Sequence, residues 1–90
     1  MTAKNKKGKK LIVTWKWQDD VDKYEIQYAL NKKFTKSKKS KKVGGYNDSV
    51  TIKKLKKGKT YYIRVRAGKK ESGAMSYSEW SAVKKVKIKK

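Results

Sequence analysis

The stretch that most constrains the fold of this chain is residues 55–67, because it joins a turn to an unbroken alternation of apolar and polar side chains. Successive side chains of a β-strand point to opposite faces of its sheet, so the alternation predicts a strand with one buried face. A helical reading would place two arginines within any apolar stripe, which disfavours a helix. The expected inward set is Tyr61, Ile63, Val65 and Ala67, and the outward set is Tyr62, Arg64 and Arg66.

Leu55, Gly58, Thr60 and Tyr61, followed by that alternation, resemble the corner between strands E and F of fibronectin type III domains. In this family the tyrosine hydroxyl bonds back to the backbone near the leucine, so the resemblance assigns a corner role to Tyr61. Ile63 stands where an immunoglobulin domain carries its second cysteine. Because the chain has no cysteine, a disulfide-bonded immunoglobulin domain is disfavoured.

Further runs rich in β-branched and aromatic residues predict strands at 11–17, 23–29, 49–53 and 83–88. The alternation within the first two of these runs points Trp15, Tyr24 and Ile26 into the core. Glu25 and Gln27 are expected on the outer face of the sheet. After the strand at 61–67, we expect residues 68–76 to form a loop.

Together with a short lysine-rich edge strand within 32–42, these runs predict an all-β fold, a seven-stranded antiparallel immunoglobulin-like β-sandwich. Residues 1–10 carry no large apolar residue beyond Met1. We therefore expect a polar linker or a weak first strand there, if a strand forms at all, and we expect the fibronectin type III domain at 11–90.

A second part of the resemblance lies near the C-terminus. Residues 77–81, Tyr-Ser-Glu-Trp-Ser, are similar to the Trp-Ser-x-Trp-Ser motif of cytokine-receptor fibronectin type III domains, with tyrosine in place of the first tryptophan. In that motif the tryptophans stack between arginines. Arg64 and Arg66 lie about 6.6–6.8 Å apart along one strand face, which leaves room for a ring. We expect Trp80 between them and Tyr77 as a second, weaker rung, a structural role with about 0.5–2 kcal/mol per contact.

Composition alone is typical of disorder, because leucine, isoleucine, valine and phenylalanine make up less than a fifth of 90 residues and the formal net charge is +21. Ten aromatic residues oppose that reading. Each can remove about 150–250 Å² from water, so a folded domain with an aromatic-rich core is expected.

Catalytic chemistry has no candidate residues. The chain contains no histidine and no cysteine, so the usual general base and the usual soft metal ligands are missing. Asp19, Asp20 and Asp22 are a conceivable calcium site, but they lack the spacing and glycine of a calcium loop and suit a turn better. We assign no catalytic, metal-binding or cofactor-binding residue and do not expect an enzyme.

The charge is the one unusual functional signal, with twenty-six lysines against two arginines. Lysine is a hydrated point charge that suits diffuse attraction rather than bidentate recognition. The candidate polyanion-binding residues are Lys32, Lys33, Lys36, Lys38, Lys39, Lys41, Lys42, Lys85 and Lys87. The alternative for those in 32–42 is protection of a sheet edge from aggregation, and the lysines could also reflect composition alone.

Three functions remain open. The chain resembles lysine-rich fibronectin type III copies in bacterial (Firmicute-type) cell-surface proteins, which implies a spacer or adhesion module near anionic wall polymers such as teichoic acids. A carbohydrate- or protein-binding accessory domain of a secreted enzyme would use exposed aromatics, for which Tyr46 and Tyr62 are eligible. A nonspecific nucleic-acid binder is the third. We expect a monomeric module of a multidomain, extracellular or wall-associated protein, with no membrane span and no signal peptide in this chain.

Overall fold

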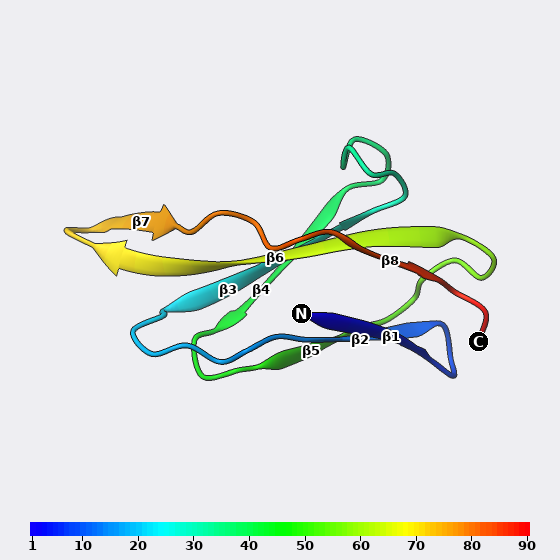
Figure 1. The fold of residues 1–90 in the computed structure, drawn as a ribbon, viewed down its shortest axis with the longest axis horizontal. Helices are drawn as coiled ribbons and strands as arrows, with labels where there is room; N and C mark the ends of the chain where they lie inside the picture. Colours follow the sequence, from blue (N-terminus) through cyan, green and yellow to red (C-terminus); the bar gives the residue numbers. More distant parts are fainter.

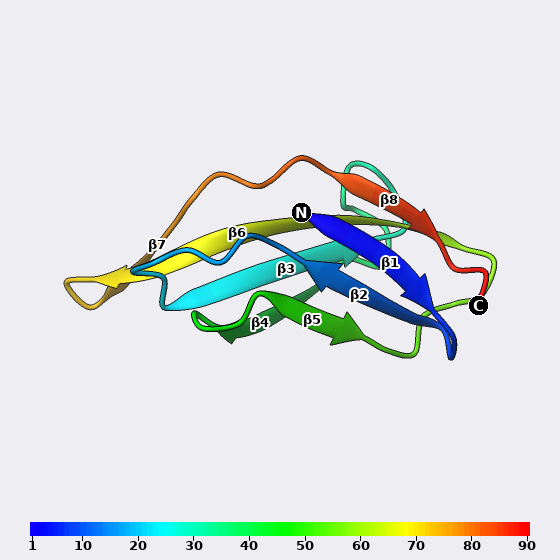
Figure 2. The ribbon, with the colours of Figure 1, turned by 60° about the horizontal axis from the view of Figure 1, so that its bottom comes forward.

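The computed structural model describes residues 1–90, which form eight β-strands in two antiparallel sheets and no helix. The smaller sheet has the order β1-β2-β5, and the larger has the order β4-β3-β6-β7, with β8 also pairing with β6. Figures 1 and 2 show the two layers facing each other, so the predicted all-β sandwich is confirmed. The strands are β1 (Thr2–Lys6), β2 (Lys10–Thr14), β3 (Lys23–Ala29), β4 (Lys39–Gly44), β5 (Ser49–Ile52), β6 (Thr60–Glu71), β7 (Ala74–Tyr77) and β8 (Lys84–Lys87).

Eight strands replace the expected seven because the last strand of the sandwich is interrupted. β6 is 12 residues long; β8 pairs with its first part and β7 with its last part. Between them, the amides of Ser78 and Ser81 donate to the carbonyls of Ala67 and Val65, each at 2.8 Å. Residues 78–83 therefore stay attached to β6 without forming a regular strand.

The expectation of a loop at residues 68–76 is wrong, because β6 continues to Glu71 and forms a hairpin with β7. The apolar alternation that marks the start of β6 stops at Gly68, so side-chain pattern gave no sign of the extension. Backbone pairing from Gly68↔Tyr77 to Glu71↔Ala74 builds the hairpin instead, with Gly73 at φ 83° in its turn.

Residues 2–6 form the strand β1, within the segment for which a polar linker or a weak first strand was expected. β1 pairs with β2 along its whole length. The amide of Asn5 donates to the Lys10 carbonyl at 3.0 Å, while its Oδ1 accepts from the backbone amides of Lys89 and Lys90 at 2.7 and 2.9 Å. Ala3 packs against the core. Backbone pairing and one asparagine hold a strand that lacks large apolar side chains.

The core lies between the sheets and is built from alternate positions of the strands. The Trp15 and Tyr24 rings pack with their centroids 5.1 Å apart. Tyr61 closes the predicted corner, since its hydroxyl accepts a hydrogen bond from the Lys56 amide at 2.9 Å. The core cluster comprises Leu11, Val13, Trp15, Tyr24, Ile26, Val50, Ile52, Leu55, Tyr61, Ile63, Val65 and Ile88.

One end of the sandwich joins the β1–β2 turn, the β5–β6 loop and the C-terminus. The amide of Lys9 donates to the Lys90 carbonyl, and the amide of Leu55 donates to the Lys9 carbonyl. Gly58 and Ile88 are similarly linked at 2.7 Å. We call residues 7–9, 53–59 and 88–90 the lysine end; they lie together at the right of Figure 1.

The opposite end joins the β2–β3 loop, the β4–β5 loop and the β6–β7 hairpin. Asp22 is its hub: its amide donates to Gly68, its carbonyl accepts from Gly45, and its carboxylate accepts from the Lys70 amide at 2.6 Å. Gly45 approaches the neighbouring backbone so closely that a Cβ there would lie 1.7 Å from the Val21 carbonyl oxygen. We call residues 15–22, 45–48 and 68–77 the hairpin end.

Candidate polyanion-binding surface

A ladder of alternating aromatic rings and guanidinium groups covers the outer face of the larger sheet. Its rungs are, in order, Phe34, Arg64, Trp80, Arg66 and Tyr77. The ring centroids lie 4.0–4.3 Å from the guanidinium carbons. Trp80 occupies the position between the arginines that the resemblance to the cytokine-receptor motif implied. Phe34 adds a rung that no local sequence pattern could reveal, because it comes from the β3–β4 loop.

The ladder also engages the polar side chains of β3. Arg64 Nε donates to Gln27 Oε1 at 2.7 Å, and Arg66 Nε donates to Glu25 Oε1 at 2.6 Å within an ion pair. Glu25 and Gln27 lie on the outer face as expected, yet they are only 8% and 7% exposed. Both arginines are therefore committed to holding the sheet face rather than to binding an external anion.

Desolvation acts on one of these arginines. Burial lowers the pKa of Arg64, the nearby positive charge of Arg66 lowers it further, and Glu25 opposes both effects. An arginine side chain nevertheless stays charged at any physiological pH. The ladder thus holds each of the two guanidinium groups between two aromatic rings, where cation–π attraction stabilises the positive charge.

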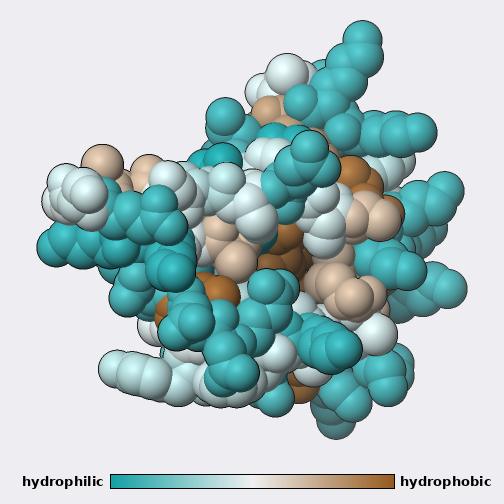
Figure 3. All heavy atoms as spheres, turned by 60° about the vertical axis from the view of Figure 1, so that its left-hand side comes forward, coloured by the Kyte–Doolittle hydropathy of each residue, from teal (hydrophilic) through white to brown (hydrophobic).

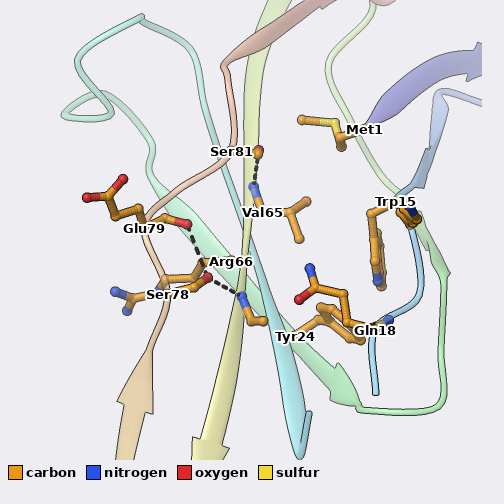
Figure 4. A pocket seen from close by; sticks show the side chains of 11 residues that line it. Met1, Trp15, Gln18, Tyr24, Val65, Arg66, Ser78, Glu79 and Ser81 are labelled. Carbon is orange, nitrogen blue, oxygen red and sulfur yellow. Dashed lines mark hydrogen bonds between the residues drawn. The ribbon is translucent and has the colours of Figure 1, made fainter. Parts of the chain in front are cut away.

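A hollow of about 260 Å³ opens beside the ladder, between Met1 and residues 78–81. Figure 4 shows Met1 and Trp15 on one side of it and Ser78, Glu79 and Ser81 on the other. The two serine hydroxyls accept hydrogen bonds from β6 amides at 3.0 Å, so they fasten the interrupted strand. Lys16 and Arg66 line this hollow together with Glu79, so it contains one acidic side chain beside its two cations.

The lysines proposed from the sequence do not form one surface. Lys32 and Lys85 face each other across a groove of about 280 Å³ with Tyr62 and Val83. Successive side chains of β4 point to opposite faces, so its lysines do not share one face. Lys41 Nζ donates to the Thr51 carbonyl of the smaller sheet at 3.2 Å, whereas Lys42 pairs with Glu25 of β3 in the larger sheet. The remaining proposed lysines are exposed at Lys33, Lys36 and Lys38 in the β3–β4 loop, at Lys39 on β4 and at Lys87 on β8.

The densest accumulation of positive charge is the lysine end. None of its lysines was among the candidate polyanion-binding residues predicted from the sequence. The lysines of 53–59 are plain in the sequence, but Lys53 was assigned to the end of a strand and residues 56–59 to a turn. What the sequence could not show is that the backbone bonds join this run to the β1–β2 turn and the C-terminus. The lysines of this end are Lys7, Lys9, Lys53, Lys54, Lys56, Lys57, Lys59, Lys89 and Lys90, and no aspartate or glutamate lies among its residues.

The hairpin end carries most of the negative charge. Five of the seven acidic residues lie in its three segments, namely Asp19, Asp20, Asp22, Asp48 and Glu71. Lys16, Lys69 and Lys70 partly balance them. In Figure 3, which turns this side forward, hydrophilic side chains cover most of the surface and hydrophobic residues show as separate patches. The molecule is thus strongly basic at one end and close to neutral at the other.

A recess of about 250 Å³ lies beside the lysine end, between the edge of the larger sheet and the β5–β6 loop. Lysine side chains surround it, and the rings of Tyr28 and Tyr61, 6.4 Å apart, form part of its floor. Burial, and secondarily the neighbouring Tyr61, raises the pKa of Tyr28. The Tyr28 hydroxyl therefore remains protonated at neutral pH and can donate a hydrogen bond.

The structure contains no helix that is long and apolar enough to cross a membrane. No group of three or more histidine, cysteine or acidic side chains lies close enough to hold a metal ion.

Comparisons with known proteins agree with this layout. A search of curated protein sequences finds no match. Among solved structures, the FN1–FN3 domains of chicken CNTN1 superpose with a TM-score of 0.82 at 21% identity, over 99% of this chain and 30% of that one. The fn3 domain of human contactin 1 gives 0.83 at 19% identity, over 99% and 73%.

This chain therefore spans less than a third of the length of the solved chicken FN1–FN3 chain that it matches. Both likenesses describe the fold. The family assignment comes from a match of residues 1–84 to the family model for the fibronectin type III domain, which includes β1 as well as the corner at Tyr61 and the ladder residues. The chain belongs to the fibronectin type III domain family.

Proposed function

We propose that this domain is a non-catalytic module of a larger bacterial surface or secreted protein, where it acts as a spacer or adhesion unit that holds anionic polymers electrostatically. The observation that carries the proposal is the lysine end, which gathers lysines from three segments without one acidic residue. Fibronectin type III domains are generally non-catalytic modules, which fits this role.

The type of cation favours a flexible polyanion over a specific partner. Lysine ammonium groups attract phosphate and sulfate as point charges and do not impose a bidentate geometry. The two arginines, which would suit specific base recognition, are held in the ladder. Most of the aromatic rings that could stack on bases lie in the core or in the ladder. An anionic wall polymer such as a teichoic acid therefore matches this surface better than a specific nucleic-acid site.

Binding of poly(glycerol phosphate) tests the proposal. Wild-type protein should bind at about 50 mM salt and lose most of its affinity at about 500 mM, because screening weakens contacts between exposed charges. Replacing Lys53, Lys54, Lys56 and Lys57 by glutamine should weaken binding at least about tenfold, since four charge contacts are removed.

A matched control removes the same net charge from the hairpin end and its neighbouring strand. The variant with Lys16, Lys23, Lys69 and Lys70 replaced by glutamine should bind within about threefold of wild type, because near this end acidic residues already offset the lysines. Equal losses in the two variants would mean that net charge, not the lysine end, decides affinity. Duplex DNA binding that survives about 500 mM salt would contradict the proposal outright.

A second candidate function has its own observation. Trp17 is 49% and Tyr46 is 88% exposed, both at the hairpin end, as expected of a surface that contacts a carbohydrate or a protein. Tyr62, the other aromatic considered from the sequence, lies partly covered in its groove. If Trp17→Ala and Tyr46→Ala abolish retention on a polysaccharide while the lysine variants do not, this second function replaces the first.

A further inference from the structure

We propose that the recess beside the lysine end is a binding site for one sugar or polyol unit that carries a phosphate or sulfate group. This inference rests on the proposed function and assigns a specific subsite within it. The recess is lined by Lys39 from β4 and by Lys53, Lys54 and Lys56 from the β5–β6 loop, above Tyr28 and Tyr61. Nothing in the sequence pattern links Lys39 to the other three lysines.

The charge of the lining selects for anions. Four lysines line the recess and no aspartate or glutamate does. Two of the other hollows contain acidic side chains: Glu79 lines the one beside the ladder, and Asp19 and Asp20 line the one at the hairpin end. The Lys32–Lys85 groove also lacks acids, but it offers two lysines and is more open. The recess therefore combines the highest positive charge with the most enclosed shape.

The floor of the recess suits a carbon skeleton next to the charge. Leu30 and Leu55 line it together with the two tyrosines. A tyrosine presents an apolar ring and a polar tip, so Tyr28 can pack against the C–H face of a sugar or polyol while its hydroxyl hydrogen-bonds. The volume of about 250 Å³ is below the roughly 300–1,000 Å³ of drug-sized pockets, which fits a single unit of a polymer.

The walls are fixed before any ligand arrives. The Tyr61 hydroxyl accepts from the Lys56 amide at 2.9 Å, which holds the loop against β6. Lys41 bridges β4 to the Thr51 carbonyl on β5, two positions beyond Lys39, which holds the strand edge near the loop. Because both walls are tied to the sandwich, the four lysines line the recess in the folded domain, and binding has to order their side chains but not the backbone.

Nuclear magnetic resonance titration of the labelled domain tests the site, at a constant ionic strength of about 150 mM. The probes are glycerol 1-phosphate and glucose 6-sulfate, with uncharged glycerol as the blank. Saturable shifts are expected at Tyr28, Leu30 and Lys39 with the two anions and not with glycerol. Tighter binding of the phosphate probe would point to a polyol-phosphate polymer as the source, and tighter binding of the sulfate probe to a sulfated glycan.

Paired variants locate the effect. Lys39→Gln with Lys54→Gln should weaken the preferred probe about tenfold, because two of the four lysine charges that line the recess are lost. Lys69→Gln with Lys70→Gln removes the same charge at the hairpin end and should leave affinity unchanged. Non-saturable shifts spread over all lysine-bearing surfaces, or equal losses in the two double variants, would overturn the recess as a site.

The outcomes also separate this inference from the proposed function. If poly(glycerol phosphate) binds wild type and the Lys39/Lys54 variant equally, and the small anions give no saturable shifts, the recess is not a site although the polymer still binds. If the small anions saturate the recess while the polymer does not bind at all, the polymer role fails and the small-anion site remains.

Discussion

At the scale of single residues, Trp80 links the two arginines that cover the outer face of the larger sheet. Its ring lies 4.3 Å from both the Arg64 and the Arg66 guanidinium carbons. The arginines in turn hydrogen-bond Gln27 and Glu25, which would otherwise be outward polar groups on a flat sheet. One ring therefore supports two cations and, through them, the polar face of β3.

Replacing Trp80 by alanine should lower the free energy of unfolding by about 2–3 kcal/mol, since two cation–π contacts of about 0.5–2 kcal/mol each are lost with the packing of the ring. For a domain of this size the melting temperature should fall by more than about 8 °C. Thermal unfolding followed by circular dichroism measures the change.

Trp17→Ala is the matched control, because that tryptophan is half exposed and belongs to no ladder rung. It should shift the melting temperature by only a few degrees, as is usual for a surface substitution. Should Trp80→Ala unfold at the same temperature as Trp17→Ala, the ladder would have no measurable role in stability.

At the scale of strands and loops, the parts best predicted from sequence are those with period-2 alternation. β3 spans Lys23–Ala29, the bounds expected, and β2 and β5 begin and end within a few residues of theirs. β1 was expected only as a weak strand, if a strand formed at all, and residues 68–76 were expected to form a loop rather than a hairpin. Their cohesion comes from backbone pairing and from Asn5, and neither leaves an apolar pattern in the sequence.

The close packing of the loops at Gly45 is a second feature that no sequence pattern reveals, because it depends on residues 21 and 22 of another loop. Alanine at Gly45 should destabilise the domain by about 1–3 kcal/mol or more, because its Cβ would collide with the Val21 carbonyl oxygen and the backbone would have to move. Chemical denaturation of the variant measures the loss.

Alanine at the adjacent Gly44 provides the comparison. A Cβ there would meet the Tyr46 ring at 3.3 Å, and that side chain is 88% exposed and can turn away. The Gly44→Ala variant should therefore unfold within about 0.5 kcal/mol of wild type. Equal stability of the two alanine variants would show that the β2–β3 and β4–β5 loops are not packed as closely as described.

At the scale of the whole molecule, the arrangement of charge matters more than its sum. The formal net charge of +21 is plain from the sequence. Its asymmetry is not, because the lysine end forms only when backbone bonds join residues 7–9, 53–59 and 88–90. For the same reason, the lysines of residues 32–42, contiguous in the chain, are split between the two sides of β4 and the β3–β4 loop.

A single end with this excess of lysine should orient any polyanion that approaches it, over a distance of about 8–10 Å at physiological salt. The principal axis of the domain extends 43 Å, so charges at the hairpin end lie several screening lengths away. Contact with a polymer should therefore be local to one end rather than spread over the molecule.

The most direct measurement is a residue-resolved map of polymer contact, obtained from amide chemical shifts as poly(glycerol phosphate) is added to the labelled domain. The shifts should concentrate in residues 7–9, 53–59 and 88–90 and fade as salt rises to about 500 mM. Shifts concentrated at Trp17, Tyr46 and the β6–β7 hairpin, or shifts that persist at that salt, would contradict an electrostatic polymer site at the lysine end.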